Sequence, residues 1–178
     1  MELINKEIEG LIEIIPKVFD DERGYFFESY NQLKLEKEIS CEFVQDNQSY
    51  STKDVLRGLH FQNPPFAQAK LVRVITGKVL DVAVDIRKNS PTFGQHVSVI
   101  LDSSKNNMFF IPEGFAHGFL ALEDSIFHYK CSNYYNHKSE SGILWNDPQV
   151  NINWGIDRPD ISPKDADLSL LRDLELDF

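Results

Sequence analysis

The stretch VLRGLHFQNPPFAQAKLVRVITGKVLDVAVDI, residues 55–86, decides the fold. From Lys70 onward, apolar and polar residues alternate in two runs that are joined by a short turn at residues 76–78. This period of two predicts a pair of strands. In the second run the even positions 80–86 are all apolar, whereas the odd positions include Asp81 and Asp85. That pattern predicts a strand with one buried face.

Strand patterns continue on both sides of this stretch. Short apolar or alternating runs occupy residues 3–16, 25–30, 96–101, 108–122 and 125–135, with turns rich in Gly, Pro and Asn between them. We expect helices only at residues 31–39, capped by Asn31, and at the C-terminus, where Ser162 would cap a helix that starts at Pro163. Many short strands without intervening helices predict an all-β antiparallel sandwich or barrel, and they disfavour a doubly wound α/β fold.

Length and charge limit the kinds of protein this can be. The chain has 178 residues, of which 42% are hydrophobic and 12% aromatic, enough for one substantial core. We therefore expect a single domain over residues 1–178. The formal charge of −10 argues against binding nucleic acid through its phosphates. An anionic ligand would have to be held by a few local cations.

The N-terminus and the cysteines indicate a compartment. The first ten residues, MELINKEIEG, are charged from the second position, and we find neither an apolar leader nor a membrane-length span. There are two cysteines, Cys41 and Cys131. We expect a cytoplasmic protein with free thiols and no membrane partner.

Three residues on or beside predicted strands form a possible reaction set: His60, Lys70 and Tyr129. A histidine of near-neutral pKa can remove a proton, and a cation can stabilise the enolate that forms next to a carbonyl. A neutral tyrosine hydroxyl can return the proton from the other side of the substrate. Such a set inverts a carbon centre. A carboxylate such as that of Asp165 would orient the imidazole.

Other interpretations compete with this one. A single His, Lys or Tyr in a β protein is more often structural, and Asp165 is also explained as the acidic third residue of a capped helix. His60 and His117 suggest a metal site. Cupin-type metal sites, however, ordinarily have two histidines spaced by one residue and a nearby Glu, whereas His60 is followed by Phe61 and Gln62. We therefore expect no metal.

Several motifs occur in the order of one family: RGLHFQ (57–62), residues 70–87, SPTFGQ (90–95), IPEGFAHGF (111–119), FHYK (127–130), LWNDP (144–148) and SPKDAD (162–167). With them the chain closely resembles the dTDP-4-dehydrorhamnose 3,5-epimerases over nearly its whole length. The resemblance implies a cupin-like antiparallel β jelly roll with short C-terminal helices, a homodimer, and no metal or organic cofactor. The implied substrate is a dTDP-linked 4-keto-6-deoxy sugar, epimerised at C3 and C5 in dTDP-L-rhamnose biosynthesis.

The resemblance also implies roles for single residues. His60 corresponds to the general base, assisted by Asp165, Tyr129 to the proton donor, and Lys70 to the lysine near the keto oxygen. The remaining implied substrate contacts are Arg23, Glu28, Gln45, Asp46, Asn47, Arg57, His117, Tyr135, Glu140 and Lys164. Tyr135 is the implied base-stacking aromatic, and five of the cations, Arg23, Arg57, Lys70, His117 and Lys164, would form a local positive pocket. We expect Asp165 to serve His60 only if it does not serve the helix cap.

Some points stay open on the sequence alone. Gln48 stands where relatives often have histidine, and residues 120–125 are slightly compressed, but neither departure touches the proton-transfer set. A C3-only or C5-only epimerase of a related nucleotide sugar, a non-catalytic sugar-nucleotide-binding cupin and a metal-dependent oxygenase are the alternatives. The pattern does not say whether subunits exchange N-terminal strands.

Overall fold

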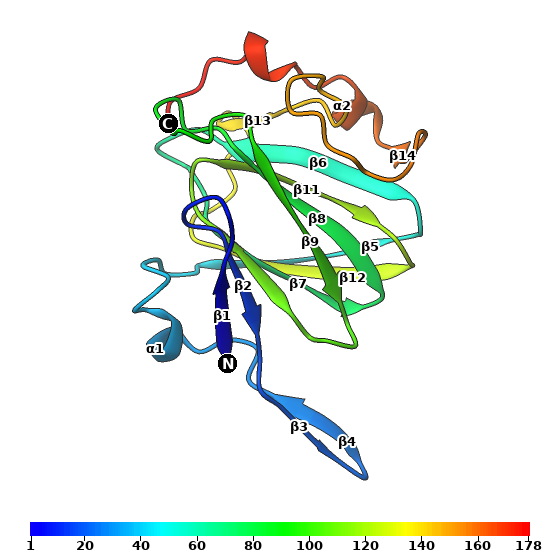
Figure 1. Ribbon diagram of the computed structural model, residues 1–178. Coiled ribbons are helices and arrows are strands. Elements are labelled where there is room, and N and C mark those ends of the chain that lie inside the picture. Colours follow the sequence, from blue (N-terminus) through cyan, green and yellow to red (C-terminus); the bar gives the residue numbers. More distant parts are fainter.

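The computed structural model describes residues 1–178 and consists mainly of two antiparallel sheets packed face to face (Figure 1). The first, sheet I, contains in spatial order β1 (Glu2–Asn5), β2 (Ile12–Ile15), β10 (Met108–Ile111), β7 (Lys70–Thr76), β12 (Ser125–Cys131) and β5 (Gln45–Ser51). Apart from the consecutive pair β1 and β2, neighbouring strands in this order are distant in sequence, as in a jelly roll. The predicted all-β, cupin-like architecture is thus confirmed.

The second sheet, sheet II, lies above sheet I in Figure 1. Its order is β13 (Glu140–Gly142), β6 (Val55–Gln62), β11 (Phe115–Ala121), β8 (Lys78–Asp85) and β9 (His96–Asp102), and β14 (Asp160–Ile161) joins β6 in parallel. A separate hairpin of β3 (Val18–Asp21) and β4 (Gly24–Phe27) projects from the body. The stretch of residues 55–86 supplies the centres of both sheets.

The main core lies between the sheets. Sheet I contributes apolar side chains such as Val72, Phe109 and Phe127, and sheet II contributes residues such as Val99 and Phe119. Phe119 and Phe127 stack with their ring centroids 4.2 Å apart, which joins β11 to β12 across the core. Burial of this apolar surface is the main force that holds the sheets together.

Both outer faces are partly covered by irregular chain. Residues 143–178 pack on the outer face of sheet II, where Trp154, Leu171 and Leu176 are buried against it. The segment with α1 (Gln32–Leu35) packs on sheet I through Leu35 and Ile39. The prediction that β8 has only one buried face is wrong, because its even-numbered face lies under residues 143–178 and its odd-numbered face lies between the two sheets. In β8, residues on both faces are buried, including Asp81 and Asp85 at 0% exposure.

The helices are shorter than the sequence pattern predicts. Asn31 does cap α1, but the helix spans only Gln32–Leu35 before it continues as a turn. The predicted strand at residues 25–30 likewise ends at Phe27. The single terminal helix is wrong: α2 spans Pro163–Ala166, and a 3-10 turn, η1, spans Leu171–Asp173.

The hydrogen bonds of the C-terminal segment explain this difference. Leu144 N donates to Ser169 O, and Leu171 N donates to the Asp147 carboxylate at 2.7 Å. These backbone groups are therefore engaged by the neighbouring segment instead of by a helical turn, and the leucine side chains still reach the core. No helix of the structure is long and apolar enough to cross a membrane.

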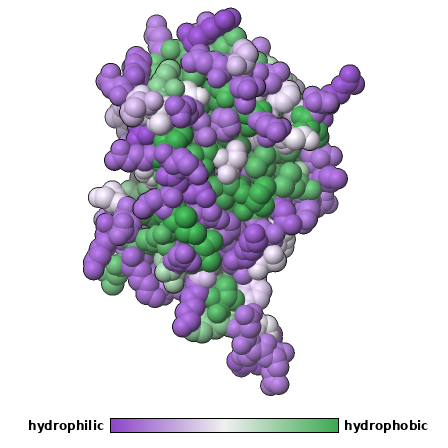
Figure 2. Space-filling view, viewed as in Figure 1, coloured by the Kyte–Doolittle hydropathy of each residue, from purple (hydrophilic) through white to green (hydrophobic).

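The β3–β4 hairpin differs from the rest of the molecule in its surface. It exposes large apolar side chains, with Phe19 at 53%, Tyr25 at 59% and Phe26 at 69%. Figure 2 shows apolar surface where the hairpin meets the body and polar residues toward its tip. Such a patch on a projecting element is typical of a surface that contacts another protein.

Candidate active site

A cleft of about 390 Å³ is lined by side chains from both sheets. Its lining residues are Gln45, Asn47, His60, Phe61, Gln62, Gln68, Lys70, Tyr129, Tyr135 and Glu140. The strands β5, β6, β7 and β12 supply most of them, so the cleft is built on rigid, paired backbone. Seven of the lining residues, including His60, Lys70 and Tyr129, were predicted as site residues, and the structure brings them together.

His60 lies on β6 and is held by an aspartate. Its Nε2 is 2.8 Å from an oxygen of Asp165, whose other oxygen accepts a hydrogen bond of 3.2 Å from Gly58 N. The Asp165 side chain is 6% exposed, whereas that of His60 is 31% exposed and faces the cleft. Burial alone would raise the pKa of Asp165, but the contacts with His60, Gly58 and Ser162 outweigh it and leave the pKa lowered.

The expectation that Asp165 serves either His60 or the helix cap is wrong, because it takes part in both. Ser162 caps α2 by accepting a hydrogen bond of 3.1 Å from Asp165 N. The Asp165 carboxylate is then free to turn inward toward His60. The cap thus fixes the backbone of the residue whose side chain orients the imidazole.

Gly58 permits this close arrangement. Its φ is +122°, and a Cβ atom there would lie 2.6 Å from Gly118 Cα of the neighbouring strand. Only glycine tolerates both the backbone conformation and the contact. The register between β6 and β11 is irregular at this point, and Asp165 reaches the amide of Gly58 directly.

A second histidine–aspartate pair lies beside the first. His117 on β11 stands opposite His60 in the strand register and is 2.9 Å from a carboxylate oxygen of Asp81 on β8. This pair is closed to solvent, with the side chains 8% and 0% exposed. Burial lowers the pKa of His117, and the charges of Lys70 and His60 lower it further, while Asp81 opposes the shift.

Lys70 and Tyr129 complete the reactive part of the cleft. Lys70 on β7 directs its ammonium group to His60 O at 3.4 Å. Burial lowers the pKa of Lys70, against the nearby negative groups. Burial raises the pKa of Tyr129, so its hydroxyl stays protonated at neutral pH. The site therefore offers a proton acceptor, a desolvated cation and a neutral proton donor.

Polar contacts arrange the other end of the cleft. The Tyr135 hydroxyl donates to Glu140 at 2.9 Å, and Lys164 donates to the same carboxylate oxygen at 2.7 Å. Tyr135 N donates to the Gln45 side chain, which in turn donates to Asn47. Tyr135 is 54% exposed and is accessible for stacking.

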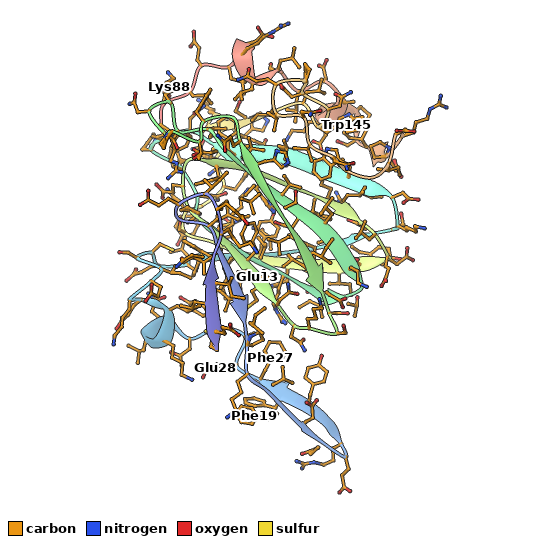
Figure 3. The ribbon with its side chains drawn as sticks, in the orientation of Figure 1. Glu13, Phe19, Phe27, Glu28, Lys88 and Trp145 are labelled. Carbon is orange, nitrogen blue, oxygen red and sulfur yellow. The ribbon has the colours of Figure 1, made fainter.

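Three predicted binding residues do not reach the cleft of their own chain. Asp46 alternates with Gln45 and Asn47 along β5, and its carboxylate pairs with Lys130 on the opposite face at 2.9 Å. Arg23 and Glu28 belong to the hairpin and pair with Asp21 and Lys34. Figure 3 shows Glu28 at the root of the hairpin, far from Trp145 at the other end of the molecule.

Of the five cations expected to form a positive pocket, only Lys70 lines the cleft. His117 lies behind the cleft. Lys164 is bound to Glu140 at its rim, whereas Arg23 is absent from it. Arg57 is an exposed residue of β6 whose guanidinium donates to Ser51 Oγ and Tyr50 O, and its charge acts on Tyr129.

Sequence reasoning missed four residues of the site: Asp81, Phe61, Gln62 and Gln68. Asp81 was assigned to the solvent face of a strand. The available indication was an acidic residue within an almost entirely apolar run, because a buried carboxylate requires a partner. Gln62 and Gln68 gave no such indication.

The histidines do not form a metal-ligand cluster in this arrangement. Each histidine of the cleft is engaged by its own aspartate. No group of three or more His, Cys, Asp or Glu side chains is placed to hold a metal ion.

Comparison with known proteins gives consistent results. The family model described as dTDP-4-dehydrorhamnose 3,5-epimerase matches residues 5–173. The chain is 53% identical over 168 residues to the dTDP-4-dehydrorhamnose 3,5-epimerase of Shigella flexneri, covering 93% of each sequence. It is 49% identical to that of Escherichia coli K12, covering 98% of this chain and 96% of the relative.

A solved structure of an epimerase is similar to this chain in both fold and sequence. The dTDP-6-deoxy-D-glucose-3,5-epimerase of Legionella pneumophila, in complex with dTDP-4-keto-L-rhamnose, matches with a TM-score of 0.94 and 48% identity. The alignment covers 98% of this chain and 94% of that one.

Proposed function

The chain belongs to the dTDP-4-dehydrorhamnose 3,5-epimerase family, and we propose that it epimerises dTDP-4-dehydro-6-deoxy-D-glucose at C3 and C5 to dTDP-4-dehydro-L-rhamnose. It is an isomerase, and its product serves dTDP-L-rhamnose biosynthesis. The observation that carries the proposal is the convergence of His60, Lys70 and Tyr129 on one cleft. The two carbons next to the C4 ketone, C3 and C5, carry protons that such a set can remove and return.

In this proposal His60 is the general base. The cleft-facing imidazole removes the proton from C3 or C5, and Asp165 stabilises the imidazolium that forms. The pair needs no rearrangement, because the 2.8 Å contact already exists in the free protein. Each proton removal produces an enolate with its charge on the C4 oxygen.

Lys70 meets that charge. Its ammonium is desolvated, and an ion pair in a low-dielectric site is stronger than in water. Tyr129 then delivers a proton to the opposite face of the carbon, since its raised pKa keeps the hydroxyl protonated. Inversion follows because the acid and the base act from different sides of the sugar.

The nucleotide occupies the other end of the cleft. We assign Tyr135 to stacking on the base, with Gln45 and Asn47 as hydrogen-bonding partners. Glu140 accepts a hydrogen bond from the Tyr135 hydroxyl, and Lys164 in turn holds the Glu140 carboxylate. Arg57 and Lys164 are the cations available to the diphosphate from the same chain.

We also propose a homodimer in which the β3–β4 hairpin reaches the cleft of the partner subunit. Two observations support it: neither Arg23 nor Glu28 lines the cleft of its own chain, and the hairpin exposes Phe19, Tyr25 and Phe26. Each hairpin would supply Arg23 as a further phosphate ligand. Sedimentation measures the dimer directly.

Mixing two inactive variants tests the exchange of hairpins. In a heterodimer of Arg23→Ala and His60→Ala chains, one of the two clefts would have both an intact His60 and an intact Arg23. The mixture should regain up to half of the activity per heterodimer. No recovery in a mixture shown to contain heterodimers would exclude the exchanged hairpin.

The experiment for the activity uses dTDP-4-keto-6-deoxyglucose in heavy water, followed by NMR. Deuterium at both C3 and C5, with a product that a reductase converts to dTDP-L-rhamnose, is the expected result. Label at one carbon only would indicate a single-site epimerase. Binding without any label would contradict the catalytic proposal and favour a non-catalytic binding protein.

A further inference from the structure

One buried side chain of the cleft has a pattern of contacts that the reaction above does not use. Gln62, at the end of β6, is 4% exposed. Its Nε2 donates to Phe66 O at 2.6 Å and to Tyr134 O at 3.2 Å, and its Oε1 accepts from Asn136 N at 2.6 Å. Both hydrogens of the amide and its oxygen are therefore engaged with backbone groups.

These contacts enclose Tyr135. One amide group binds the carbonyl of the residue before Tyr135 and the N–H of the residue after it. The third contact, with Phe66 O, ties this turn to the neighbouring turn after β6. Tyr135 itself is 54% exposed, so little packing holds it in place. Its position depends on the hydrogen bonds of its backbone and hydroxyl.

Gln62 also lies at a fixed distance from the general base, His60. His60 and Gln62 are two positions apart on one strand, so both side chains point to the same face, about 7 Å apart. β13 and β11 pair with β6 on either side and keep this strand in place. The backbone of β6 therefore carries the imidazole at one point and the anchor of Tyr135 at the next.

We propose that Gln62 is a positioning residue that sets Tyr135 for the nucleobase and fixes its distance from His60. The inference rests on the proposed function, because it takes Tyr135 as the stacking partner of the base. It predicts a specific separation of effects. Loss of the Gln62 contacts should weaken binding of ligands that have a base and spare those that have only phosphates.

The test is the Gln62→Met variant, which keeps the length of the side chain and removes all three hydrogen bonds. Calorimetry with dTDP should show a Kd raised about 10-fold, the size expected for one lost stacking contact. The inhibition constant of inorganic pyrophosphate, measured against the epimerisation reaction, should stay within about twofold. KM should rise, while kcat changes much less.

Two further variants separate positioning from general damage. Asn133→Ala removes contacts with Pro65 O and Tyr134 N in the same pair of turns but leaves the three hydrogen bonds of Gln62 intact. The Kd for dTDP should therefore be unchanged within about twofold. In a Tyr135→Ala background, Gln62→Met should raise the Kd for dTDP little further, because both changes act on the same stacking contact with the nucleobase.

Each outcome is decisive. If wild-type protein neither binds dTDP nor exchanges substrate protons, the proposed function fails, and this inference fails with it. If the wild type does both and folded Gln62→Met binds dTDP as tightly as the wild type, only this inference is overturned. Equal weakening for dTDP and pyrophosphate also overturns it. Should Gln62→Met not fold, Gln62→Glu, which keeps the acceptor for Asn136 N, must show the same selective loss for dTDP.

Discussion

Two histidine–aspartate pairs are built on neighbouring strands of sheet II, and they differ mainly in exposure. In both pairs a histidine nitrogen is within 3 Å of a carboxylate, at 2.8 Å for His60–Asp165 and 2.9 Å for His117–Asp81. The imidazole of His60 is 31% exposed and faces the cleft, whereas that of His117 is 8% exposed. A hydrogen-bonded pair thus does not by itself identify a base. Access to the substrate does.

The partners of the two histidines differ as well. Asp165 comes from the short helix α2, outside the sheet, and its side chain contacts Gly58 and His60 of β6. Asp81 belongs to β8, at the centre of the sheet. The open pair is therefore assembled by distant parts of the chain, while the closed pair is part of the sheet. We expect substitutions in the open pair to affect rate, and those in the closed pair to affect stability.

Asp165→Asn should have the largest effect among changes that keep His60. The amide cannot stabilise the imidazolium as a carboxylate does, so kcat should fall about 100-fold with a smaller change in KM. Steady-state kinetics measures this. Circular dichroism should show an intact fold, since Ser162 still caps α2. A wild-type kcat would remove Asp165 from the mechanism.

Tyr129→Phe sharpens the roles within the open cleft. Because His60 remains, proton removal and deuterium exchange at C5 should persist. The carbon should no longer be inverted cleanly, because the hydroxyl that returns the proton to the opposite face is missing. NMR of the product in heavy water distinguishes exchange from inversion. Unchanged yield of the inverted sugar would mean that another group returns the proton.

His117→Ala tests the closed pair. It leaves the fully buried Asp81 without its partner, which should cost about 3 kcal/mol of unfolding free energy. We expect exchange to fall no more than about 10-fold under conditions where the variant is folded. Denaturant titration gives the stability, and a loss of exchange without any loss of stability would reverse the distinction between the pairs.

Asp85 offers a third buried carboxylate, one that is paired with an arginine instead of a histidine. It accepts hydrogen bonds from Arg87, Ser90 and Thr92, which outweigh burial and lower its pKa to about 2. A depressed pKa stabilises the folded state at a pH above the ordinary carboxyl range, and this contribution is lost as the pH falls toward 2. It amounts to about 2 kcal/mol.

Asp85→Asn should therefore lower stability at pH 7 by about that amount and leave kcat unchanged. The difference from the wild type should shrink as the pH falls from about 4 toward 2. Unfolding curves at several pH values measure it. A constant difference over this range would mean that the charge of Asp85 contributes nothing.

Much of the fold was predictable because alternation of apolar and polar residues identifies strands. Residues 70–86 gave two strands, β7 of one sheet and β8 of the other, in this way. Burial of both faces of β8 was not predictable, because Asp81 and Asp85 look like solvent-facing residues until His117 and Arg87 are placed beside them. The alternation of residues within one strand does not show which side chains other parts of the chain will place beside it.

The site was predictable to a similar degree. The residues on β6, β7 and β12 were found through their motifs, and the structure brings them together. Asp46 does not line the cleft, which its motif could not show because a motif does not specify strand phase, and its carboxylate pairs with Lys130 on the opposite face. Arg23 and Glu28 lie on a projecting hairpin, whose target depends on a second subunit. Gln62 was missed because its importance lies in backbone contacts with two turns.

The central claim is that the exposed pair, not the buried one, removes the substrate proton. The most direct test measures deuterium incorporation at C3 and C5 of dTDP-4-keto-6-deoxyglucose by His60→Ala and His117→Ala side by side, with the wild type as reference. We predict no incorporation above the uncatalysed level with His60→Ala and clear incorporation with folded His117→Ala. Incorporation by His60→Ala at the wild-type rate would contradict the account.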